Sequence, residues 1–249
     1  MKSRYRSQLI FLVIVFLALW VAMAIRPFDH EAWVMENLPV LAAVIVFWCI
    51  RRKFIFSRLS YTLIFVFLCL HEIGSHYTYS KVPYDEWIHA VTGWSLDGFL
   101  GWERNNYDRV IHFLYGFLFA YPIREVFLRV ANVRGFWGYF LPLDLTMSTS
   151  MLYELVEWAV AEVFGGELGM AYLGVQGDAW DAHKDMALAS LGAFFAMSIT
   201  AAVNARWQRD FSREWIDSLR VKQSAPLGEE ALAKMQSAKR SASSRKMKN

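Results

Sequence analysis

The chain has 249 residues, of which 56% are apolar and 20% are charged, and its formal net charge is +3. This small positive excess gives no indication of a nucleic-acid partner, because it lies where anionic inner-leaflet lipid would attract it, and we expect no nucleic acid to bind. The two cysteines lie inside apolar segments and are typical of small core hydrophobes, which excludes a disulfide framework.

Six apolar segments follow one another along the chain. A helix that spans a bilayer core needs roughly 20 residues. They occupy residues 9–25, 38–50, 59–73, 110–123, 136–164 and 186–203. The second and fourth are short and reach full length only by recruiting flanking residues, such as 36–39 and 124–127. The sequence therefore predicts an all-α fold, a polytopic membrane helical bundle with about six transmembrane helices.

Basic residues are unevenly distributed among the connections. Of the 26 Lys and Arg residues, the first, third and fifth connections hold only Arg26, Lys81, Arg104, Arg109 and Lys184. By the positive-inside rule, these connections are external and both termini are cytoplasmic. A buried helix pair in a soluble protein would not show this asymmetry, so we expect a multi-pass protein of the cell inner membrane.

The first apolar segment has a second interpretation. Three basic residues precede it and Ala22-Met23-Ala24 ends it, which also fits a secretory signal peptide with a small-x-small cleavage site. The run is long for a signal peptide and Arg-Pro follows at once, so we favour a retained helix. The next connection is external in either case.

We divide the chain into three parts. Residues 1–205 form the transmembrane helical domain. In residues 206–221, large apolar side chains recur at every fourth position among arginines, which predicts an amphipathic helix on the inner membrane surface. Residues 222–249 have almost nothing to bury and predict a basic, disordered cytoplasmic tail that anionic inner-leaflet lipid attracts.

The third connection, residues 74–107, is long and rich in Tyr, Trp and Gly. A long external loop in a compact bundle is typical of a lid or a binding surface. An aromatic belt at the membrane interface is the alternative, and the sequence leaves both open.

Ionisable side chains gather at one end of four apolar segments. They are His71, Glu72 and His76; Asp108 and His112; Glu154 and Glu157; and Asp178, Asp181 and Asp185. With cytoplasmic termini, all four groups reach the outer leaflet, and spacings of three or four residues put the last group on one helix face. An ionisable group near hydrocarbon costs a few kcal/mol or more unless it is paired, hydrated or bound to a metal, so we expect one shared site.

Several of these residues also have a purely structural explanation. Asp178 and Asp181 could cap the sixth helix, and Asp108 the fourth. The two histidines after the third segment could be ordinary polar residues at a helix end. The two glutamates of the fifth segment lie too deep for a helix-end role, which favours a functional or buried, paired state.

Carboxylates gathered in a region of low dielectric repel one another unless protons or a cation neutralise them. Oxygen-rich ligation favours magnesium or manganese, and the histidines allow zinc or iron, so we expect a divalent metal without assigning its identity. We select His112, Glu154 and Asp108 as catalytic residues. The predicted metal ligands are Asp178, Asp181, Asp185, Glu157, His71, Glu72 and His76.

Four stretches of the chain carry a family resemblance. They are residues 71–79, Asp108-Arg109 with His112, Tyr153-Glu154 with Glu157-Trp158, and residues 176–186. In them the chain resembles the uncharacterised bacterial inner-membrane family that includes YjdF. The resemblance covers nearly the whole membrane part without the tail, and it implies a multi-pass membrane protein with no established activity.

A more distant similarity covers part of the chain. Asp108-Arg109-x-x-His112-Phe113 and Glu154 are similar to the Asp-Lys-x-x-His-Phe pattern and the membrane Glu of the VanZ-like proteins, which are linked to glycopeptide-antibiotic tolerance. The chain departs from that pattern at Glu157 and Trp158, where a Gln is usual, and at Asp185, where an Asn is usual. The extra carboxylate favours a metal.

Our preferred hypothesis is a metal-dependent hydrolase with a periplasm-facing site, acting on a lipid-linked or envelope substrate. Two alternatives use the same residues: a small proton- or cation-coupled transporter, and a non-catalytic membrane scaffold. Membrane lipids are the expected partners. The sequence lacks the His-x-x-His-His pattern of membrane hydroxylases, a Gly-rich phosphate loop, a Gly-x-Ser-x-Gly elbow and a His-Glu-x-x-His helix.

Overall fold

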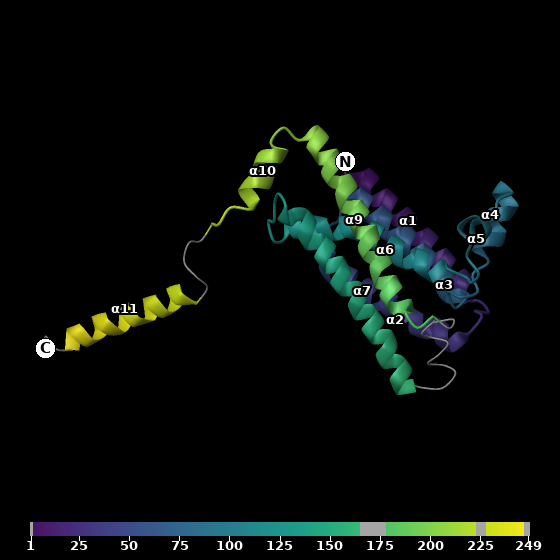
Figure 1. The fold of residues 1–249 in the computed structure, drawn as a ribbon, viewed down its shortest axis with the longest axis horizontal. Helices are drawn as coiled ribbons and strands as arrows, with labels where there is room; N and C mark the ends of the chain where they lie inside the picture. Colours follow the sequence, from purple (N-terminus) through teal and green to yellow (C-terminus); the bar gives the residue numbers. More distant parts are fainter. Residues whose placement is uncertain (1, 165–177, 223–227, 247–249) are drawn as a thin grey trace.

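The computed structural model describes residues 2–164, 178–222 and 228–246, and every regular element in these ranges is helical (Figure 1). The helices are α1 (Lys2–Ala24), α2 (His30–Ile50), α3 (Arg58–His76), α4 (Tyr84–Thr92), α5 (Leu96–Leu100), α6 (Tyr107–Arg129), α7 (Trp137–Phe164), α9 (Asp181–Trp207), α10 (Phe211–Ser218) and α11 (Glu229–Lys246). The predicted all-α fold is confirmed.

Five helices, α1, α2, α3, α6 and α9, are long and apolar enough to cross a membrane. Helix α7, outside this group of five, has 28 residues, ample length at about 1.5 Å per residue, and its interior holds the carboxylates of Asp144, Glu154 and Glu157. It packs against both α6 and α9 (Figure 1). The polytopic bundle is thus confirmed, while the count of six and the cytoplasmic termini stay predictions.

The centre of the bundle is the contact between α6 and α9, where two glycines let the backbones touch. A Cβ on Gly116 would lie 1.8 Å from the carbonyl oxygen of Ala189, and one on Gly192 would lie 2.0 Å from the carbonyl oxygen of Phe113. No side chain fits at either position. This contact sets the first turns of α6 beside the first turns of α9, where four of the ten predicted site residues lie: Asp108, His112, Asp181 and Asp185. We call this the site end of the bundle; α3 also ends there.

Helix α2 begins well before the apolar run from residue 38 that predicts it. The side chain of Asp29 accepts the backbone N–H groups of Glu31 (2.9 Å) and Ala32 (3.0 Å), so a polar cap defines the start at His30. The earlier start places Glu36 inside the helix, where it is buried.

Helix α1 is tied to the bundle by polar contacts along its length. Gln8 donates to the hydroxyl of Thr62 (3.1 Å), and the Trp20 indole N–H donates to the side chain of Asn37 (2.7 Å). Retention of the first helix stays a prediction.

Residues 206–221, predicted as one amphipathic helix, are divided between two helices in the structure. Helix α9 continues to Trp207, and the shorter α10 turns Phe211 and Trp215 onto Tyr139 of α7. Half of the apolar stripe therefore packs against protein, while Trp207 stays 82% exposed. The stripe is divided between α9 and α10, because the start of α7 offers an aromatic partner to α10, and the place of this segment on the inner membrane surface stays a prediction.

The predicted disordered tail contains helix α11 within its described residues. Its Ala, Glu, Lys and Gln content has high helix propensity, and this accounts for a helix with almost no apolar face. The division into three parts at residues 205 and 221 stays a prediction.

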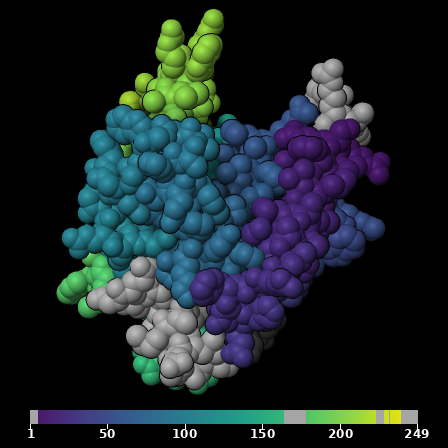
Figure 2. Space-filling model, turned by 90° about the vertical axis from the view of Figure 1, so that its right-hand side faces the viewer, coloured from purple at the N-terminus to yellow at the C-terminus, as the bar shows by residue number. Residues whose placement is uncertain are grey.

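The connection between α3 and α6 folds as a small unit that covers the site end of both helices. Val82 and Tyr84 pack with Tyr107 and Ile111 of α6 in a buried cluster. The connection, blue in Figure 2, forms a compact surface beside the purple α1. Its outer side leaves Trp94 and Phe99 exposed, so both the lid and the aromatic-belt interpretations stay open.

Candidate functional site

Three side chains from α6 and α9 converge at the site end. One nitrogen or oxygen atom from each of Asp108, His112 and Asp185 lies within 4.8 Å of the other two, a spacing suited to one metal ion. Asp108 and His112 are one turn apart on α6, with 3.6 Å between Oδ1 and Nε2. Asp185 is buried, and its Oδ1 has no hydrogen-bond partner among the described residues. A cation would satisfy that oxygen.

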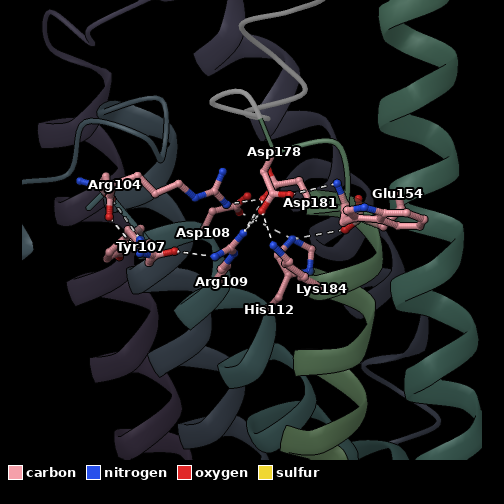
Figure 3. Close-up of polar contacts among 12 residues, drawn as sticks. Arg104, Tyr107, Asp108, Arg109, His112, Glu154, Asp178, Asp181 and Lys184 are labelled. Carbon is pink, nitrogen blue, oxygen red and sulfur yellow. Dashed lines mark hydrogen bonds and ion pairs between the residues drawn. The ribbon is translucent and has the colours of Figure 1, made fainter. Parts of the chain in front are cut away.

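Helix α7 adds carboxylates to this group. The Oε1 atom of Glu154 lies 3.5 Å from Nε2 of His112, and no described residue donates a hydrogen bond to it. Figure 3 shows His112 between Asp108 and Glu154. Glu157, one turn further along α7, lines a neighbouring cavity. Glu154 thus lies beside the three-residue group, and Glu157 lines the cavity next to it; that all these residues serve one site stays a prediction.

Asp178 and Asp181 are engaged by cations instead. Asp181 is paired with Arg104, and its Oδ1 lies 3.3 Å from Nη2 of Arg109. Asp178 is paired with Arg109, and Lys184 Nζ lies 2.6 Å from its Oδ2 (Figure 3). These two predicted ligands therefore form a charged rim beside the Asp108, His112 and Asp185 group. The sequence predicted an external position for Arg104, Arg109 and Lys184, but it did not predict that they pair with these two carboxylates.

The ion pairs of Asp178 should stabilise the folded protein equally at neutral and mildly acidic pH. The pKa of Asp178 lies well below its usual range, because Lys184 and the backbone N–H of Trp180 donate to the carboxylate. A carboxyl whose folded pKa is depressed contributes stability above its unfolded pKa, about 3.9, and loses it only as the pH falls through the folded value. We expect Asp178→Asn to lower the melting temperature equally at pH 7 and pH 5. A difference that vanishes at pH 5 would contradict the pairing.

His71 lies apart from the three-residue group, with both ring nitrogens in use. Its Nδ1 lies 2.5 Å from the hydroxyl of Tyr79, and its Nε2 lies 3.0 Å from the carbonyl oxygen of Glu36. Burial holds the pKa of the Tyr79 phenol well above its usual range, so the hydroxyl is protonated and donates to Nδ1. Nε2 then carries the imidazole proton. His71 has no free nitrogen for a metal.

A strained turn holds Tyr79 in place. Thr78 and Tyr79 both have φ of 53°, a left-handed conformation that costs non-glycine residues roughly 1–3 kcal/mol each. The Tyr79 ring then lies over Gly74, where an added Cβ would come within 2.6 Å of it. The His-Glu-Ile-Gly-Ser-His stretch therefore needs its glycine to let this tyrosine reach His71.

The other two predicted ligands of α3, Glu72 and His76, lie outside the three-residue group. His76 Nδ1 lies 2.8 Å from the carbonyl oxygen of Met23, which joins α3 to the end of α1. Glu72 is fully buried and lies beside the side chain of Asn37 on α2. Neither residue belongs to the group formed by Asp108, His112 and Asp185.

A cavity of about 270 Å³ opens between α2, α3, α6 and α7. Its polar lining residues toward the site end include Glu36, His71, Tyr79, Asp108, His112, Tyr153 and Glu157, and Thr78, Tyr115, Thr149 and Ser150 complete the polar lining. By helix register, the opposite part of its wall is formed by residues such as Ala43, Phe67 and Phe119. The cavity is therefore amphipathic along its length, with a carboxylate-rich end and an apolar end.

A family model described as a predicted membrane protein (DUF2238) matches residues 8–206. The chain belongs to this family. It is 35% identical over 184 residues to the inner membrane protein YjdF of Escherichia coli (strain K12), an alignment that covers 74% of this chain and 84% of that protein. No solved structure gives a significant match.

Membership and the apolar helices confirm a multi-pass protein of the inner membrane, whose exposed helix faces contact lipid. The matched range ends with α9 and leaves out the tail, as the resemblance implied. Residues 176 and 177 of the fourth resembling stretch lie outside the described residues. The VanZ-like similarity stays a prediction.

Glu36 and Tyr153 are site residues that the sequence analysis missed. Glu36 is buried in the cavity wall, and the Tyr153 hydroxyl donates to its Oε2 (3.2 Å). The signal was present, since an acidic residue preceded the second apolar run, but it was interpreted as a flank of a short span.

Proposed function

We propose that the protein is a metal-dependent hydrolase acting on a lipid-linked substrate of the envelope. The observation that supports this most strongly is the position of Asp108 and His112. Both residues belong to the group suited to a metal, and both line the amphipathic cavity. An apolar chain would occupy the cavity while the ester or phosphate group of the same molecule stays beside the carboxylates.

The donor set fits a divalent metal. Asp108, His112 and Asp185 would hold the ion, because their donor atoms converge and the Oδ1 of Asp185 is buried without a hydrogen-bond partner among the described residues. Two carboxylates and one imidazole suit manganese, zinc or iron, and magnesium less well. When bound, the metal would supply Lewis acidity and lower the pKa of a water.

The surrounding residues have roles of their own in this proposal. The Glu154 carboxylate accepts a proton from the attacking water, whose oxygen forms the bond to phosphorus or to the acyl carbon. The bond to the leaving oxygen breaks, and the proton passes from Glu154 to that oxygen. Arg104, Arg109 and Lys184 would attract an anionic headgroup once a bound divalent ion offsets the neighbouring carboxylates.

Filling the apolar end of the cavity tests the role of the cavity. Ala43 lines it, whereas the adjacent Ala42 is exposed on the outer face of α2. With metal-loaded protein in nanodiscs and a panel of lipid-linked phosphates and esters, we expect Ala43→Trp to lower hydrolysis at least about tenfold. Ala42→Trp is the matched control and should keep the wild-type rate. Equal rates in the two variants, or no turnover of any substrate by wild type, would overturn the proposal.

We also propose that the basic tail, residues 222–249, associates with anionic inner-leaflet lipid. Its support is the excess of Lys and Arg over two glutamates in that segment. This association is a matter of charge and is separate from the candidate site.

A further inference from the structure

The end of the bundle opposite the site holds a second cavity, of about 380 Å³. It lies among the ends of α6 and α9, the start of α7 and α10, and its polar lining residues are Arg124, Arg134, Asn204, Gln208 and Glu214. The charge pattern of the sequence predicts that this end lies in the cytoplasm. None of these residues takes part in the proposed hydrolysis.

Arg124 is held in the cavity wall, and no described residue forms an ion pair with it. Its guanidinium carbon lies 4.5 Å from the centroid of the Tyr139 ring, a cation–π contact that fixes its orientation. Its Nε is buried and has no hydrogen-bond partner among the described residues. The Tyr139 hydroxyl is in turn held by Asn204 Nδ2 at 2.7 Å. A fixed guanidinium with an unused donor is suited to an anion.

The turn that carries Arg134 is also fixed in position. Gly135 has φ of 59°, and an added Cβ there would lie 2.4 Å from the carbonyl oxygen of Glu214 on α10. Ser218 of α10 accepts the N–H of Phe136 (2.9 Å) through its hydroxyl. Helix α10 therefore closes one side of the cavity and locks the turn, so the two arginines line a preformed site.

We propose that this cavity binds a ligand with a phosphate group and, next to it, a hydroxyl or ammonium group that donates a hydrogen bond. The phosphate would lie between Arg124 and Arg134, and the Glu214 carboxylate, which repels a bare anion, would accept a hydroxyl or ammonium proton of the same ligand. A glycerol phosphate unit has this chemistry. It is found both in lipid headgroups and in soluble compounds.

Native mass spectrometry of the full-length, delipidated protein tests this site. One arm adds phosphatidylglycerol in detergent, and the other adds free glycerol phosphate. We expect Arg124→Gln and Arg134→Gln to reduce the bound fraction at least about tenfold, because each removes a charged donor. Arg213→Gln, an equal charge change on an exposed residue of α10 outside the cavity, is the matched control.

Each outcome decides the proposal. If wild type binds only phosphatidylglycerol and both cavity variants lose it, the site exists and its ligand is a lipid. If wild type binds glycerol phosphate and both variants lose it, the site exists and its ligand is a soluble compound. Arg134 is exposed, so its variant should fold even if Arg124→Gln does not. Absence of both adducts from wild type, or equal binding by Arg134→Gln and Arg213→Gln, would overturn the proposal.

Discussion

Replacing Gly116 by alanine is expected to cost about 3 kcal/mol or more of folding free energy, the upper part of the range for overpacking a core. The added methyl group would lie 1.8 Å from the carbonyl oxygen of Ala189, and backbone cannot rotate away as a side chain can. Helices α6 and α9 would have to separate. Thermal unfolding in detergent should show a large fall in the melting temperature, together with loss of any metal affinity.

Gly138→Ala is the matched control for this prediction. Its methyl group would meet the end of a flexible side chain, Leu128 Cδ2, at 3.3 Å. Alanine also has the higher helix propensity, so we expect little change or a small gain in melting temperature. Similar melting temperatures for the Gly116 and Gly138 variants would show that α6 and α9 do not touch as described.

Replacing Asp185 by asparagine is expected to have opposite effects on the metal-free and the metal-loaded protein. Without metal, the change removes one of several carboxylates that repel one another, so the apo protein should melt at a higher temperature. Metal binding should stabilise the wild-type protein by about 2.7 kcal/mol when the free metal concentration is one hundred times the dissociation constant. The variant should lose this gain in stability. Thermal unfolding with and without manganese, zinc, iron or magnesium measures both effects.

Asp181→Asn serves as the comparison variant, because Asp181 is paired with Arg104 and Arg109. It should lower the melting temperature in both states and leave the metal-induced gain intact. If Asp185→Asn also destabilised the apo protein and wild type gained nothing from any metal, the cluster would act as a scaffold that joins α6 to α9.

The fold could be predicted from the sequence because the apolar or basic character of whole segments decides their place in a membrane protein. The alternation of apolar runs with basic turns predicted the bundle, and the predicted fifth segment, 136–164, agrees with α7 to within a residue at its start. Glu154 lies too deep in that helix to be a cap, and the structure sets it beside His112. Antiparallel helices of similar length bring such residues to one level.

The roles within the site depended on contacts that no local pattern encodes. Arg104 reaches Asp181 across 77 positions of the chain, so a predicted ligand became part of an ion pair. The two ring nitrogens of His71 are engaged by the Tyr79 hydroxyl and the Glu36 carbonyl oxygen. Tyr79 reaches His71 because Thr78 and Tyr79 are left-handed, a conformation that has no sequence signature in Thr or Tyr. Glu36 was missed because the cap at Asp29, not apolarity, sets the start of α2.

The metal content of the detergent-purified protein tests the central claim most directly. Elemental mass spectrometry would compare wild type with an Asp185→Asn variant that is shown to be folded. A metal-dependent site predicts one divalent ion per chain, or close to it, in wild type and its loss in the variant. No metal in either protein, even after reconstitution with manganese, zinc, iron and magnesium, would contradict the proposed function.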